Sequence, residues 1–80
     1  MTDLQKPDER VERITVTIDD DHLAEIQTVA VALQNVGMNV GQVLATIGII
    51  TGDAPAAKID ELKQVAGVVD VEPDQPMQAL

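Results

Sequence analysis

The pattern that most limits how this chain can fold lies in residues 14–19, ITVTID, where β-branched apolar residues alternate with polar ones. In an extended chain, the isoleucines and the valine fall on one side and the threonines on the other. Alternation with a period of two predicts a half-buried β-strand. The fold must therefore contain a sheet.

A helical pattern follows this strand. Asp19, Asp20 and Asp21 are suited to a helix start, where side-chain oxygens accept from free N–H groups and negative charge is favoured. Apolar residues then recur at helical spacing, and Gly37 is typical of the position just past a helix. The recurring residues are Leu23, Ile26, Val29, Ala30, Leu33 and Val36. We expect a helix over about residues 21–36.

The second half of the chain repeats this order after a hairpin. Residues 40–52, VGQVLATIGIITG, are too long for one ordinary strand, so we expect a hairpin with its turn near Thr46–Gly48. The next three residues, Asp53–Pro55, are expected to open a second helix, with the proline at its first position. The apolar residues of this helix are Ile59, Leu62 and Val65 or Ala66, and Gly67 ends it.

A last strand is expected in VVDVE, residues 68–72, with Val69 and Val71 on one face and the two acidic residues on the other. Pro73 and Pro76 prevent a regular central strand beyond it.

The order strand, helix, strand, strand, helix, strand predicts an α+β fold, the ferredoxin-like β-α-β-β-α-β sandwich. We expect a four-stranded antiparallel sheet with both helices on one face, its first and third strands central and its other face uncovered. The expected organisation is a disordered N-terminal tail over residues 1–10, one domain over residues 11–74 and an extended C-terminal tail over residues 75–80.

Composition excludes several classes of function. The 14 acidic and 5 basic residues give a formal charge of −9, which repels phosphate backbones, and no aromatic residue is present to stack on bases. We expect no nucleic-acid partner. The chain has no cysteine, which excludes disulfides and thiolate metal sites. We expect neither a metal nor a cofactor.

The sequence also shows neither the pattern of a signal peptide nor that of a membrane span. The first residues, MTDLQKPDERVER, contain no apolar run, unlike a signal peptide. No stretch approaches the roughly 20 apolar residues of a membrane span. We expect a cytoplasmic protein without a membrane partner, and a monomer, with a homodimer as the alternative.

Catalytic side chains are scarce. The chain has no serine, and its one histidine, His22, is expected to be a solvated residue of a first helical turn. A Schiff-base lysine would have to be Lys58 or Lys63, but Asp60 and Glu61 lie beside them and favour the protonated, non-nucleophilic amine. We therefore expect no enzymatic activity.

The last ten residues, VEPDQPMQAL, carry a distinctive pattern. Glu72 and Asp74 alternate, so they lie on one side of an extended chain. Pro76 stiffens the segment, and Met77 and Leu80 supply apolar side chains. A frayed end is the ordinary explanation. The pattern also fits a segment that a partner binds.

Several segments together resemble the subtilisin-propeptide family of serine protease inhibitors. The matching order is ITVTID, IGIITG, AAKIDELKQV, AGV and VDVEPDQ, and the most specific stretch is GVVDVEPDQ, which is similar to the family's Gly-Val…Val-Glu-x-Asp signature. The resemblance spans some sixty positions. One departure is Ile49, where the family commonly has an aromatic residue, and this departure concerns core packing.

The resemblance implies how such a protein would act. The uncovered sheet face would pack on two parallel surface helices of a subtilisin-like protease. Glu72 and Asp74 would each meet free N–H groups at a helix N-terminus. The tail from Gln75 would add to the substrate cleft as an extended strand.

The resemblance also implies roles for the last residues. Leu80 would fill the primary specificity pocket and Met77 the fourth pocket, with Gln78 and Ala79 between them. The terminal carboxylate would lie near the oxyanion hole as a product mimic. Because no protease domain follows, we expect a stand-alone inhibitor, with a second role in assisting the folding of a protease. The alternative is a ferredoxin-like binding or regulatory module that takes a small ligand or dimerises.

Overall fold

A computed structural model describes residues 10–73 of the chain. The strands are β1 (Val11–Ile18), β2 (Asn39–Leu44), β3 (Ile49–Pro55) and β4 (Val68–Pro73), and the α-helices are α1 (Ile26–Val36) and α2 (Ile59–Leu62). Two short 3₁₀ helices, η1 (Asp20–Glu25) and η2 (Ala56–Lys58), precede the α-helices. The sheet is antiparallel, with strand order β2-β3-β1-β4. This is the ferredoxin-like β-α-β-β-α-β topology that the sequence predicts.

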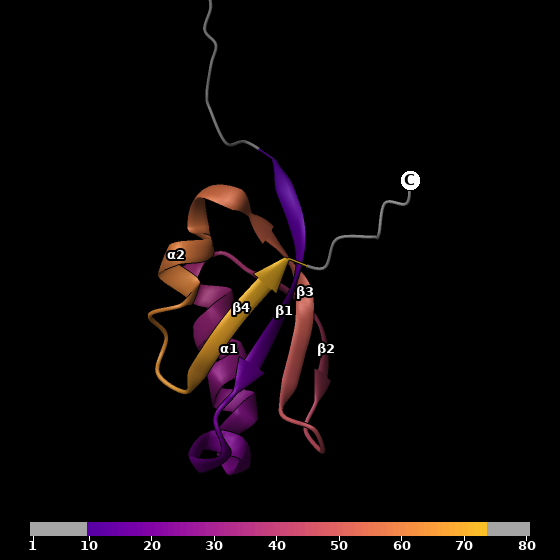
Figure 1. Cartoon of the computed structure of the whole chain (residues 1–80), viewed down its shortest axis with the longest axis vertical. Coiled ribbons are helices and arrows are strands. Elements are labelled where there is room, and N and C mark those ends of the chain that lie inside the picture. The colour runs from indigo at the N-terminus through magenta and orange to yellow at the C-terminus, as the bar shows by residue number, and fades with distance from the viewer. Residues whose placement is uncertain (1–9, 74–80) are drawn as a thin grey trace, which may run out of the picture.

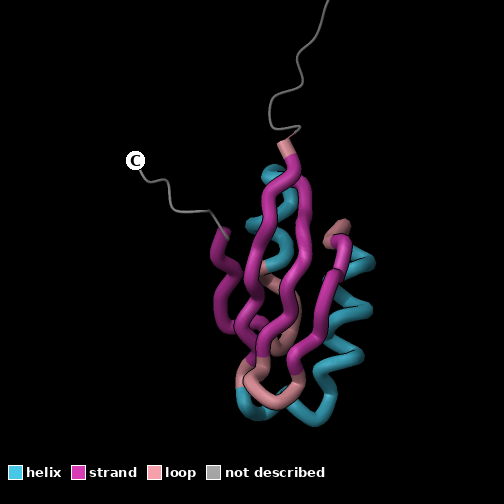
Figure 2. Tube along the Cα trace, turned by 90° about the vertical axis from the view of Figure 1, so that its right-hand side faces the viewer, coloured by secondary structure: helices cyan, strands magenta, loops and turns pink. Residues whose placement is uncertain are grey.

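Both helices lie on the same face of the sheet (Figures 1 and 2). The side chains between the two layers form one apolar cluster, in which the largest fully buried residues are Ile14, Val16, Leu33, Ile50 and Leu62. Each is aliphatic, as the absence of aromatic residues requires. No described element covers the opposite face of the sheet, which is turned toward the viewer in Figure 2.

The central position of β1 follows from its alternation. Val16 pairs with Ile50 of β3 on one side and with Val71 of β4 on the other, and all three residues are buried. The end of β1 is tied to two turns, because Ile18 N–H donates to the Gly48 carbonyl (2.8 Å) and Asp19 N–H donates to the Gly67 carbonyl (2.9 Å). The hairpin turn lies between Leu44 and Ile49, as predicted.

The first helix differs from the expected one at its beginning. Asp20–Glu25 winds as a 3₁₀ helix, and the α-helix begins only at Ile26. Asp19 is the N-cap, and its carboxylate accepts from Asp21 N–H at 2.7 Å. Consecutive aspartates favour such local side-chain hydrogen bonds over a helix interior, which explains the tight first turns. The helix ends at Gly37 as predicted, with φ of 130°.

The prediction that Asp53–Pro55 opens the second helix is wrong for Asp53 and Ala54, whereas Pro55 is the N-cap of η2 and stands one position before the predicted one. These residues end β3, where Pro55 pairs with Val11 and has extended backbone angles (φ −60°, ψ 137°). Ala54 is fully buried in the core. Proline is tolerated at a strand end, where its missing N–H leaves no gap in the ladder. The helical region therefore starts later, at Ala56, and its α-helical part spans Ile59–Leu62 only.

The prediction that Val69 and Val71 share a face is also wrong. Val71 is 3% exposed and Val69 is 61% exposed. The register against β1 shifts here: Ile18 pairs with Val68, whereas Thr17 pairs with Asp70. Val69 is thus the extra residue of a β-bulge, and Val68 packs against the core in its place.

Candidate functional site

The face of the sheet that carries no helix is the candidate site, and we call it the open face. The strand register assigns to it Val11, Arg13, Thr15 and Thr17 of β1, Asn39, Gln42 and Leu44 of β2, Ile49, Thr51 and Asp53 of β3, and Asp70 and Glu72 of β4. Most of these side chains are polar. A mostly polar face stays soluble when free and can still form hydrogen bonds with a partner.

Glu72 lies on the open face, on edge strand β4. It pairs with Thr15 of the central strand, and its side chain is exposed. The structure therefore places this carboxylate where a molecule packed on the open face would meet it. The other site residues expected from the sequence, Asp74, Met77, Gln78, Ala79 and Leu80, lie outside the described residues.

Both edges of the sheet carry features that discourage strand addition. On β4, the Asp70 carboxylate accepts from the N–H of Val71 at 2.9 Å, so this backbone donor is already occupied. On β2, Gly41 forms a bulge, because Val40 pairs with Gly52 and Gln42 pairs with Thr51. A bulge, or a side chain that already occupies an edge N–H group, hinders a further strand from pairing. Binding through the open face is therefore favoured over pairing at an edge.

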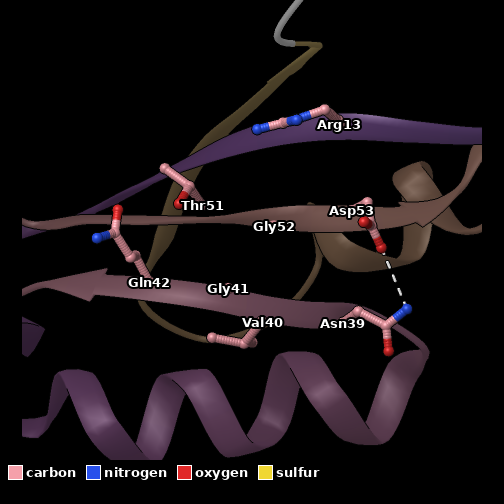
Figure 3. A pocket seen from close by; sticks show the side chains of 8 residues that line it. All are labelled: Arg13, Asn39, Val40, Gly41, Gln42, Thr51, Gly52 and Asp53. Atoms are coloured by element: carbon pink, nitrogen blue, oxygen red, sulfur yellow. Dashed lines mark hydrogen bonds between the residues drawn. The ribbon is translucent and has the colours of Figure 1, made fainter.

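A depression lies on the open face over the β2–β3 bulge (Figure 3). Gly52 pairs with Val40, and the bulge residue Gly41 lies beside it, since a Cβ atom at Gly41 would be 3.6 Å from Gly52 Cα. Both glycines line the depression, and neither adds a side chain to it. Its walls carry Arg13, Asn39, Gln42, Thr51 and Asp53, with Val40 completing the lining. The volume is about 410 Å³, within the range of ligand-sized pockets, but the depression is open to solvent.

The two ends of the depression differ in chemistry. At one end, Asn39 Nδ2 donates to Asp53 Oδ1 at 3.1 Å, so Asp53 is an acceptor already held in place. At the other end lie Gln42 and Thr51, which pair across the strands. Figure 3 shows Arg13 extending toward this second end, away from Asp53. The second end therefore gathers hydrogen-bond donors and one positive charge.

The sequence pattern did not predict this depression. The alternation of β1 already puts Arg13 on the same face as Thr15 and Thr17. What the pattern did not indicate was the bulge at Gly41, which sets Gln42 opposite Thr51. Asp53 was also misplaced, since it was expected in a helix.

His22 lies in the first turns of the helical region, as predicted, but it is only partly solvated: its side chain is 34% exposed. Its Nδ1 atom is buried and lies 3.4 Å from Asp19 Oδ1, which is long for a hydrogen bond. A Cβ atom at Gly67 would lie 3.0 Å from His22 Cγ, so the histidine ring packs on this glycine. The contact joins η1 to the turn before β4, and its role is structural.

The pKa of Asp19 lies below its ordinary value of 3.8, chiefly because the carboxylate accepts from the N–H of Asp21. The stability that this carboxylate contributes is present above pH 3.8 and is lost as the pH falls through its lowered pKa. We expect Asp19→Asn to be less stable than the wild type at pH 6, and we expect the difference to narrow as the pH falls below 3.8 and through the lowered pKa, because an amide keeps the acceptor but not the charge. Urea midpoints from circular dichroism at several pH values measure this.

The control for this pH series is Asp20→Asn, which removes an exposed carboxylate from the same turn. Its loss of stability at pH 6 is expected to be smaller than that of Asp19→Asn, because the Asp19 carboxylate is the one that caps the turn. A gap between Asp19→Asn and the wild type that does not narrow in acid would contradict the assigned role of the Asp19 charge.

The other residues considered from the sequence are located as follows. Lys58 Nζ lies 3.4 Å from Glu61 Oε1, so this lysine pairs with a carboxylate as the sequence suggested. Among residues 10–73, no group of three or more acidic or histidine side chains could hold a metal ion. No helix among them is long and apolar enough to span a membrane.

No protein-family model, curated protein or solved structure matches this chain. Its class therefore rests on its own geometry. The molecule is a small ferredoxin-like α+β domain with an open, mostly polar sheet face, blunted edges and an exposed carboxylate, Glu72, on the strand that leads into the C-terminal residues.

Proposed function

We propose that this domain inhibits a subtilisin-like serine protease by packing its open face on the protease surface and placing its C-terminal residues in the substrate cleft. The observation that carries the proposal is the position of Glu72. It stands exposed on the open face, on the edge strand that continues toward the C-terminus. A carboxylate there suits the free N–H groups of a helix start on a partner.

Further support comes from the resemblance of GVVDVEPDQ to the signature of subtilisin propeptides and from the sheet edges. Because β2 carries a bulge and the Val71 N–H of β4 is occupied, neither edge is suited to pairing with another strand along its length. The face is left as the broad surface through which a partner would bind.

In this proposal the C-terminal residues act as a product mimic. Residues 75–80 add to the protease as an extended strand, Leu80 fills the primary pocket and Met77 fills the fourth pocket. Asp74 joins Glu72 in binding helix N-termini. The same contacts, made by a folding protease, would assist its folding.

The proposal is tested by titrating subtilisin with the 80-residue chain and with a variant that lacks Leu80. We expect inhibition by the full chain and inhibition weaker by about 10–100-fold in the variant. Emptying an apolar pocket costs about 1.4–3 kcal/mol, which corresponds to that change in affinity. The inhibition constant is measured from the rate of substrate cleavage.

A matched control is Val31→Ala, which removes an exposed apolar side chain (54% exposed) from α1, on the helical side of the domain. Its inhibition constant is expected to stay within about twofold of the wild type. Equal inhibition by the full chain and the variant without Leu80 would refute the product-mimic role. Absence of inhibition by both proteins would refute the proposed function. The alternative would then be a regulatory module, and light scattering would measure whether it forms a dimer.

A further inference from the structure

We propose that the depression on the open face binds a carboxylate side chain of the protein partner, and that Arg13 is the residue that selects it. This inference rests on the proposed function, since it names a feature that the partner must present to the same face.

The charge of Arg13 is free to be used. Within residues 10–73, its guanidinium takes part in no hydrogen bond or ion pair, although Asp53 is its neighbour in the strand register. Figure 3 shows the side chain directed along β1 toward the end of the depression that holds Thr51 and Gln42. In a chain with a formal charge of −9, an exposed arginine that pairs with no described carboxylate is available to an outside anion.

The donors at this end fit a carboxylate. A guanidinium offers two parallel N–H groups to the two oxygens of a carboxylate, and the Thr51 hydroxyl and the Gln42 amide add further donors. Asp53 pairs with Arg13 across the strands, but its carboxylate accepts from Asn39 and the Arg13 side chain extends away from it in Figure 3. The donors beside Arg13 therefore suit a carboxylate that enters the depression from a partner.

A partner side chain is favoured over a free small anion because the depression is open. A single exposed ion pair changes an affinity by at most about fivefold, since water screens it. The same pair gains strength when a large interface covers it and removes the water. Only a macromolecule that covers the open face provides that cover.

The register also states how the partner must arrange its charges. Glu72 pairs with Thr15, and Arg13 lies two residues from Thr15 on the same face of β1. Strand spacing of about 4.8 Å and a rise of about 3.3 Å per residue put the two Cα atoms roughly 8 Å apart. The partner must therefore present a carboxylate to Arg13 at about one to two helical turns from the N–H groups that bind Glu72.

The test compares Arg13→Glu and Arg13→Gln with Lys63→Glu in the subtilisin titration. Arg13→Glu and Lys63→Glu change the total charge equally, but Lys63 is an exposed residue at the end of α2, on the helical side. We expect inhibition about 5–20-fold weaker for Arg13→Gln, at least about 20-fold weaker for Arg13→Glu, and within about threefold of the wild type for Lys63→Glu. The urea midpoints of the free variants show whether all three remain folded. If Arg13→Glu unfolds the domain, the role of Arg13 is judged from Arg13→Gln alone.

The outcomes separate this inference from the proposed function. If the wild type inhibits and both charge reversals behave alike, the role of Arg13 is refuted and the proposed function stands. If the wild type does not inhibit, both fall together. A third arm titrates the free protein with sodium acetate against sodium chloride and follows backbone amide shifts. Saturable acetate shifts at Arg13, Gln42 and Thr51 would overturn the assignment to a partner side chain and indicate a small-anion site.

Discussion

Replacing Leu33 by alanine is expected to lower the free energy of unfolding by about 2–5 kcal/mol. Leu33 is fully buried (0% exposed) and lies on α1, between this helix and the sheet. A domain of 80 residues has only about 4–12 kcal/mol of stability in total. The cavity left by the missing side chain would therefore remove a large share of the total stability.

Urea unfolding followed by far-ultraviolet circular dichroism measures this loss, since the chain has no tryptophan or tyrosine to report by fluorescence. Val31→Ala is the matched control, because the same helix carries this valine on its exposed side. Its loss is expected to be below about 0.5 kcal/mol. A loss below about 1 kcal/mol for Leu33→Ala would contradict the position of Leu33 in the core.

Replacing Gly52 by alanine is expected to destabilise the domain by at least about 2 kcal/mol. A Cβ atom at Gly52 would overlap the carbonyl oxygen of Asn39 and would lie 2.9 Å from the amide nitrogen of Gly41. Both contacts are with backbone of β2, which cannot turn aside as a flexible side chain can. Strands β2 and β3 would have to move apart, at the cost of ladder hydrogen bonds.

Gly41→Ala provides the control from the opposite strand of the same bulge. Its Cβ atom would lie 3.4 Å from the Thr51 carbonyl oxygen and 3.6 Å from Gly52 Cα, close to ordinary contact. We expect a change smaller than about 1 kcal/mol, since alanine also restricts the unfolded chain. Equal urea midpoints for the two variants would show that the close approach at Gly52 is relieved without cost.

The periodicity of the chain was sufficient for the topology, and the aspartates and Gly37 were sufficient for the ends of the first helical region. The prediction from local pattern was wrong in the residues that end β3, up to Pro55, and at Val69. Pro55 has a local preference for a helix start, but its pairing with Val11 keeps it in β3. Val69 fits an alternating strand, but the bulge against Ile18 and Thr17 turns it outward. In both places a contact with a distant strand overrides the local pattern.

The candidate site was likewise only partly predictable from the sequence. The position of Glu72 on the sheet face opposite Val71 could be predicted, because the two residues are adjacent in a short strand and side chains alternate along a strand. The depression around Arg13 could not, because it depends on the register of β2 against β3 and on the missing side chains of Gly41 and Gly52.

By itself, the sequence determined the order of the strands and helices, the aliphatic core and the excess of negative charge, because these depend on residue type and spacing along the chain. Only the tertiary structure decided which residues bulge out of the sheet, where β3 ends and which polar groups meet on the open face. Those features depend on how distant strands pair, and a shift of one residue in that pairing changes the side to which a side chain points.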